Sequence, residues 1–155
     1  MASIKHGAVT LERIYASPTE QVFTALSTRE ALLEWSAPSG GWTFSYDRFD
    51  FRVGNTDVAE FGPIGGEPYV NETTYLAIEP GRRIISATTI AYRAKLIFAG
   101  ILTMELETAG NGTLLRLNET GAYLDDADGP DGHEAGWTEM LDGLGAWLKR
   151  NRRAA

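Results

Sequence analysis

Apolar residues recur at three- and four-residue spacing near the end of the chain and alternate with polar residues through its middle. The spacing near the end predicts a helix of about 20 residues that follows Asp128-Gly129-Pro130 and ends at Arg150. Its apolar stripe consists of His133, Trp137, Met140, Leu141, Leu144, Trp147 and Leu148. Gly136, Gly143 and Gly145 interrupt this helix. Because glycine weakens a helix, we expect another backbone or a ligand to lie close to these positions.

The alternation between Trp42 and Thr120 predicts about six antiparallel strands joined by short connections. We place them at Thr43–Arg52, Thr56–Phe61, Tyr69–Ile78 and Arg83–Tyr92, then from the break near 93–95 to about Thr108, and at Thr113–Thr120. Pro80 and Gly81 predict a type II turn after the third of these strands, and Asn111-Gly112 predicts a hairpin before the last. In the first strand, Phe44, Tyr46 and Arg48 are expected on one face and Phe49 and Phe51 on the other.

The beginning of the chain predicts one further strand and two short helices. The strand is Ala8–Tyr15, and Ser17-Pro18-Thr19-Glu20 is a helix start in which Ser17 caps and Glu20 completes a capping box. A second helix follows Thr28 and carries Leu32, Leu33 and Trp35. Since the chain offers no other apolar partner, the stripe of the last helix is expected against the concave face of the sheet. We therefore predict a single α+β domain over residues 1–155, with an apolar cavity between sheet and helix.

Composition narrows the possible functions. The chain has 155 residues, 43% hydrophobic and 23% charged, which is typical of a globular domain. It contains no cysteine, which excludes disulfides, thiolate nucleophiles, iron–sulfur clusters and cysteine-bound zinc. A net charge of −7 argues against a nucleic-acid partner. The longest apolar run, Leu96–Leu102, is too short to cross a bilayer, and Met1–Gly7 has no signal-peptide character, so we expect a cytoplasmic protein without membrane insertion.

Familiar catalytic and metal-binding motifs do not appear in the sequence. His133-Glu134 begins like the zinc-protease motif His-Glu-x-x-His, but Trp137 occupies the fifth position and the only other histidine is His6. The acidic run Asp125–Asp128 lacks the ligand spacing of a calcium loop. No phosphate-binding glycine loop or Gly-x-Ser-x-Gly elbow is present. We therefore expect no metal and no cofactor.

Three polar residues are candidates for chemistry, each with a structural alternative. Glu119, near the end of a predicted strand, is a possible base if it points inward, or a solvated carboxylate if it points outward. His133 begins the apolar stripe and either binds a ligand or Glu119, or has a capping or structural role. Tyr75 is the third candidate acid or base. The aromatic and apolar residues that are expected to line a ligand cavity are Trp35, Trp42, Tyr46, Phe49, Tyr75, Tyr92, Phe98, Trp137 and Leu141.

Several short stretches, taken in order, resemble a known family. They are 16–23 (Ala-Ser-Pro-Thr-Glu-Gln-Val-Phe), 33–35 (Leu-Glu-Trp), 51–54 (Phe-Arg-Val-Gly), 72–80, 112–117, 133–137 (His-Glu-Ala-Gly-Trp) and 141–144 (Leu-Asp-Gly-Leu). On these motifs the whole chain resembles the START-like, birch-allergen-like (SRPBCC) superfamily, and within it the homologues of the activator of the heat-shock-protein-90 ATPase. The resemblance implies the helix-grip fold, in which the sheet wraps the long helix around a cavity for hydrophobic ligands such as lipids or polyketides.

Three functions remain open at this point. The first is cofactor-free binding of a small hydrophobic or aromatic molecule, with a homodimer possible. The second is an enzyme of cyclase, dehydratase or hydrolase type that uses polar cavity residues. The third is a chaperone-interacting module. The partner domain of the true chaperone activators has no counterpart in this sequence, and Asn55 stands where the family often has glycine, which argues against chaperone contact.

Overall fold

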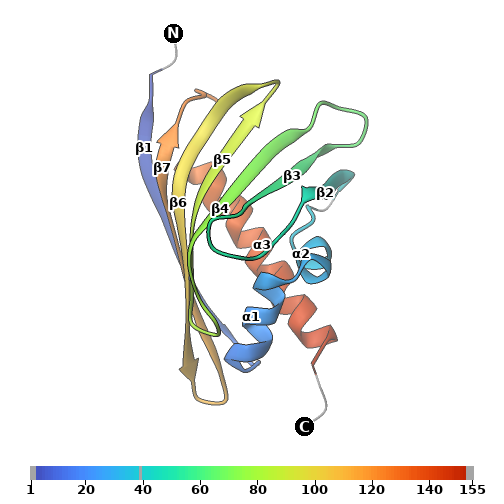
Figure 1. Cartoon of the computed structure of the whole chain (residues 1–155), viewed down its shortest axis with the longest axis vertical. Helices are drawn as coiled ribbons and strands as arrows, with labels where there is room; N and C mark the ends of the chain where they lie inside the picture. The colour runs from blue at the N-terminus through green and yellow to red at the C-terminus, as the bar shows by residue number, and fades with distance from the viewer. Residues whose placement is uncertain (1–2, 39, 153–155) are drawn as a thin grey trace.

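The computed structural model describes residues 3–38 and 40–152. Within them the elements are β1 (Lys5–Tyr15), α1 (Thr19–Ser27), α2 (Arg29–Trp35), β2 (Trp42–Arg48), β3 (Thr56–Pro63), β4 (Tyr69–Glu79), β5 (Arg83–Tyr92), β6 (Lys95–Ala109), β7 (Gly112–Tyr123) and α3 (Pro130–Arg150). Figure 1 shows the long helix α3 crossing one face of a curved sheet, with α1 and α2 beside its C-terminal half. The predicted order of elements and the α+β helix-grip fold are confirmed.

The sheet is antiparallel, with the strand order β1-β7-β6-β5-β4-β3-β2. From β2 to β7 each strand pairs with the next one along the chain, as short connections favour. β1 then pairs with β7 in continuous register, from Lys5 opposite Tyr123 to Tyr15 opposite Thr113. The first strand therefore lies beside the last, and β1 and β2 form the two free edges.

The core fills the space between the sheet, α1 and α3. Leu115 and Leu117 of β7 and Leu141 and Leu144 of α3 are fully buried. Trp137, in the same stripe as the two α3 leucines, is only partly buried. Within the described residues, no helix combines the length and apolar character that crossing a bilayer requires.

α3 is held by the first strand and the short helices as well as by the sheet face. The Tyr15 hydroxyl donates to the Leu141 carbonyl at 2.8 Å. A Cβ built on Gly143 would lie 2.7 Å from the Trp35 carbonyl oxygen of α2, and one on Gly145 would lie 3.3 Å from the Tyr15 ring. The close backbone approach expected at the helix glycines is thus present at Gly143, whereas the neighbour of Gly145 is a side chain and Gly136 has no neighbour within 4 Å. From the sequence, we expect the sheet to be the only apolar partner of α3. The structure corrects this, since α1 and α2 also cover its apolar stripe.

The predicted cap of α1 is wrong. Pro18, not Ser17, is the N-cap residue, and no side chain caps the helix. The Thr113 hydroxyl donates to the Ser17 carbonyl at 2.7 Å and ties the Ser17 backbone to β7. The Ser17 hydroxyl is buried and makes no hydrogen bond. A capping box is therefore absent at this helix start.

Two turns also refine the prediction. β2 ends at Arg48 rather than Arg52, because the Asp50 amide turns to donate to Asp57 Oδ1 at 2.7 Å. This brings the Phe51 ring within 4.8 Å of Tyr75, on the core side rather than on the opposite face. The predicted hairpin after β6 forms, but its central residues are Gly110 and Asn111, with Gly110 at a φ of +59°.

Candidate functional site

The strand register shows which side chains share the face that α3 covers. Tyr75 lies opposite Ser86, Ser86 opposite Leu102, and Leu102 opposite Glu119, which makes one row across β4, β5, β6 and β7. Trp137 of α3 donates to Glu119, so this row is on the concave face. Side chains two residues apart along a strand share a face. Tyr69 lies six residues before Tyr75 on β4, so by this rule it faces the same side, as does Phe61 opposite it on β3.

Four aromatic rings from four adjacent strands lie along that face. Phe61 of β3 stacks on Tyr69 of β4, with ring centroids 5.2 Å apart, and Tyr69 lies 4.7 Å from Tyr92 of β5. Trp42 of β2 stacks 6.3 Å from both Phe61 and Tyr69. Trp42 is 39% exposed and the other three are partly buried, so these rings, hereafter the aromatic row, present apolar surface to solvent. A row of this kind suits a flat apolar ligand, because aromatic rings gain from offset stacking.

A buried carboxylate lies deeper on the same face, below the aromatic row. Asp57 is 2% exposed. Its Oδ2 accepts from the Tyr75 hydroxyl at 2.6 Å, and its Oδ1 accepts from the Asn55 side chain at 3.0 Å and from the Asp50 amide. Burial, followed by the hydrogen bond and charge of Asp57, raises the pKa of Tyr75 above its ordinary value. Tyr75 therefore stays protonated and serves as a donor rather than a base.

A second polar cluster joins β7 to the start of α3. Glu119 is 4% exposed and points inward, which decides between the two orientations considered for it. His133 Nδ1 lies 2.6 Å from Glu119 Oε1, and His133 Nε2 lies 3.0 Å from Asp128 Oδ2. Trp137 Nε1 donates to Glu119 Oε2 at 3.0 Å. Both ring nitrogens of His133 thus face carboxylate oxygens, an arrangement that favours the imidazolium, which donates from both.

The surroundings of His133 set its protonation. Burial lowers its pKa, but the hydrogen bond and charge of Glu119, together with the charge of Asp128, outweigh burial, and the pKa is raised. The rings of Phe98 and Tyr123 lie 4.5 and 4.9 Å from the imidazole. The Tyr123 hydroxyl is buried without a hydrogen-bond partner, and burial with the nearby carboxylates raises its pKa to about 12. This cluster accordingly holds the His133 imidazolium between the carboxylates of Glu119 and Asp128. Beside it lies the Tyr123 hydroxyl, which has no hydrogen-bond partner.

The predicted site residues fall into separate groups. Trp42 and Tyr92 belong to the aromatic row, and Tyr46 contacts Phe49 with centroids 5.1 Å apart. Glu119, His133 and Trp137 come together, while Tyr75 belongs with Asp57. Trp35, Phe98 and Leu141 are core residues: Trp35 donates to the Ala25 carbonyl, and the other two are fully buried.

Sequence reasoning missed Asp57, Asp128, Tyr123, Phe61 and Tyr69. Phe61 and Tyr69 flank the predicted loop at 62–68, and two aromatics in those places are expected to face each other across a hairpin. Asp57 alternates with Ala59 and Phe61, so a charge on an inward position was the available signal. Among residues 3–38 and 40–152, no three His, Asp or Glu side chains are arranged so that they could hold a metal ion together.

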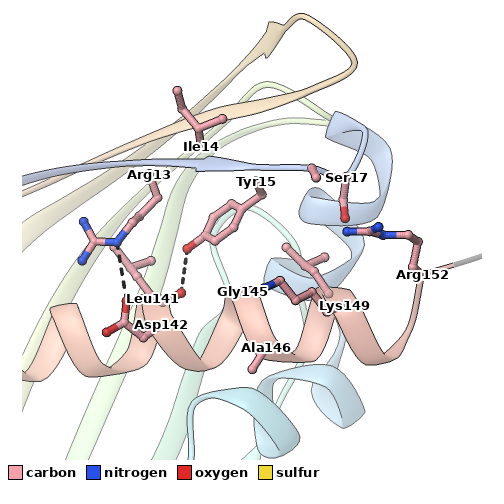
Figure 2. Close-up of a pocket in the computed structure, with 12 residues that line it drawn as sticks. Arg13, Ile14, Tyr15, Ser17, Leu141, Asp142, Gly145, Ala146, Lys149 and Arg152 are labelled. Atoms are coloured by element: carbon pink, nitrogen blue, oxygen red, sulfur yellow. Dashed lines mark hydrogen bonds and ion pairs between the residues drawn. The ribbon is translucent and has the colours of Figure 1, made fainter.

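A pocket in the described part of the chain lies away from the aromatic row. It has a volume of about 460 Å³ and lies between the end of β1 and the C-terminal half of α3 (Figure 2). A smaller one lies on the surface between β5, β6 and β7, among Arg82, Glu107 and Arg116. The apolar cavity expected between sheet and helix thus stays a prediction.

Comparison with known proteins agrees with the fold. The model of the family described as "Activator of Hsp90 ATPase homolog 1-like protein" matches residues 16–149. A crystal structure of a protein from Rhizobium loti is 33% identical, covers 94% of this chain and 99% of its own, and has a TM-score of 0.84. A Rhizobium leguminosarum protein is 28% identical over 97% of this chain and 99% of its own, with a TM-score of 0.87. None of the curated proteins matches the chain.

Proposed function

The chain belongs to the family of Activator of Hsp90 ATPase homolog 1-like proteins, and on that premise we propose that it binds a small hydrophobic or aromatic molecule on the concave face, without a cofactor. The observation that carries this proposal is the aromatic row of Trp42, Phe61, Tyr69 and Tyr92. Four neighbouring aromatic rings that stay partly open to water on a concave face form a surface suited to a flat apolar ligand.

The free energy for binding would come chiefly from removing apolar surface from water. At about 25 cal/mol per Å² of apolar area, a bicyclic aromatic gains several kcal/mol before the costs of association are subtracted. The Asp57–Tyr75 and Glu119–His133 clusters supply polar groups that orient one end of the ligand. A micromolar dissociation constant is therefore the expectation.

A neutral fluorescent probe tests this proposal. N-phenyl-1-naphthylamine should bind with increased emission, and the double variant Trp42→Ala/Tyr69→Ala should weaken its binding about tenfold or more, since each lost ring contact contributes about 0.5–1.5 kcal/mol. The matched control is Leu76→Ala/Ile101→Ala, which removes two exposed apolar side chains outside the aromatic row, 49% and 42% exposed. Failure of the probe to bind the folded protein, or equal weakening by both double variants, would contradict the proposal.

An enzymatic function is the second candidate, and the paired polar clusters on the concave face favour it. Glu119 and His133 form a hydrogen-bonded pair of titratable groups, 2.6 Å apart, which is within the reach over which protons transfer. A substrate screen of the wild-type protein tests this candidate. Catalysis is assigned to this pair if turnover disappears in both Glu119→Gln and His133→Gln while the affinity for the probe stays within about tenfold. Turnover that survives both substitutions would exclude a catalytic role for Glu119 and His133.

A further inference from the structure

The pocket between β1 and α3 lies at the β1 edge of the sheet, away from the aromatic row, which begins at the β2 edge. β1 and β2 are the two edges of the sheet, so the pocket and Trp42 belong to opposite edges. Its wall combines apolar side chains, among them Ile14, Leu141 and Leu148, with basic ones. Its volume of about 460 Å³ falls within the range of small-molecule sites.

The charge of this pocket is opposite to that of the chain. Arg13, Lys149 and Arg152 line it, with Asp142 as the one acidic residue. Arg13 Nε lies 3.7 Å from Asp142 Oδ1, so these two charges largely cancel. No ion pair of Lys149 or Arg152 occurs among residues 3–38 and 40–152. Within the described residues, two cations without an ion pair therefore line one pocket in a chain of net charge −7.

A buried hydroxyl without a partner adds a polar group to this pocket. Ser17 lines the pocket, is 1% exposed, and its Oγ makes no hydrogen bond in the described structure. Figure 2 shows this hydroxyl at the start of α1, directed toward the end of α3 that carries Lys149 and Arg152. Buried hydroxyls without partners are uncommon, because each loses its hydrogen bonds to water. The start of α1, which no side chain caps, adds the positive end of a helix dipole beside Ser17.

We propose that this pocket binds a small amphipathic anion, whose carboxylate or phosphate accepts from the Ser17 hydroxyl and pairs with Lys149 and Arg152, and whose apolar part lies along the exposed apolar side chains of Ile14, Ala16 and Ala146. Lys149 and Arg152 are exposed, so their long side chains move at little cost and admit the anionic group to the covered hydroxyl. The site is independent of the concave-face site and uses none of its residues.

Calorimetric titration of the full chain with four small molecules tests the proposal. Octanoate and octyl phosphate separate the two sources of the anion, inorganic phosphate tests the charge alone, and octanol tests the apolar part alone. We expect saturable binding of at least one alkyl anion, at least tenfold tighter than octanol and phosphate. Equal affinity for octanol would overturn the proposal, as would the absence of alkyl-anion binding.

Variants locate the site. Lys149→Ala/Arg152→Ala should weaken the alkyl anion about tenfold or more, because charge-assisted contacts are the strong ones. The control Arg48→Ala/Lys95→Ala removes the same charge from exposed residues outside the pocket, on the far edge and at the far end of the sheet, and should stay within about threefold, as expected for distant screened charges. Ser17→Ala should weaken binding about threefold or more while leaving the denaturation midpoint unchanged or raised, since the hydroxyl has no partner to lose.

Amide NMR shifts give a readout that does not depend on the variants folding. Perturbations by the alkyl anion should concentrate at 13–17 and 141–152. Perturbations centred on Trp42, Tyr69 and Tyr92 instead would place the anion on the concave face and overturn the proposal. Equal weakening by the two double variants, or unchanged affinity of Ser17→Ala, would overturn it as well. The neutral-probe test of the concave face is unaffected by any of these results.

Discussion

Two glycines of α3 are expected to respond oppositely to the same substitution. Gly143 and Gly136 both lie inside the helix, where alanine is favoured over glycine by about 1 kcal/mol. At Gly136 the added methyl meets nothing within 4 Å, so Gly136→Ala should stabilise the protein by up to about 1 kcal/mol. At Gly143 the methyl would lie 2.7 Å from the Trp35 carbonyl oxygen, where ordinary contact begins at 3.4 Å. That oxygen is backbone, so α2 or α3 must move.

The cost of this movement decides the sign at Gly143. Overpacking of this degree costs about 2–3 kcal/mol. After the gain in helix propensity, Gly143→Ala should destabilise the protein by about 1–2 kcal/mol. Urea denaturation followed by tryptophan fluorescence measures both variants, and with a slope of about 2 kcal/mol/M their midpoints should differ by about 1 M or more. Shifts of the same sign and size would refute the close approach of α2 to α3.

Two further substitutions test the core and the buried histidine. Leu144 is fully buried, so Leu144→Ala should lower the free energy of unfolding by about 2–5 kcal/mol in the same urea assay, and an unchanged midpoint would show that α3 does not bury its stripe. The pKa of His133 is raised in the folded protein. Its protonation therefore contributes fully to the free energy of unfolding below the unfolded pKa of about 6.5, and this contribution is lost as the pH rises through the folded pKa. The untagged wild-type protein should therefore lose more stability than His133→Gln between about pH 6 and pH 9, and parallel pH profiles would contradict the imidazolium between Glu119 and Asp128.

The sequence allowed the elements to be predicted, because the signals for them are local. The stripe of α3 and the Pro80-Gly81 turn are set by residues a few positions apart, and Arg82 N indeed donates to Glu79 O at 2.9 Å. The contact between Glu119 and His133 was also considered, since both lie at the ends of adjacent elements.

Partners that are far apart in the sequence were not predictable in the same way. Alternation fixes which face a strand residue occupies, but not which residue of the neighbouring strand lies opposite it. The Asp57–Tyr75 bond and the stacking of Trp42 on Tyr69 depend on that register. The absence of a Ser17 cap was not predictable from local sequence either, because the Ser17 carbonyl accepts a hydrogen bond from Thr113, which is distant in the sequence.

A crystal structure grown with N-phenyl-1-naphthylamine tests the central claim most directly. The account predicts density for the probe on the concave face, stacked against Tyr69 and Tyr92 and bounded by the first half of α3. Density for the probe only in the pocket between β1 and α3, or a concave face that stays empty although the probe saturates the protein in solution, would contradict it.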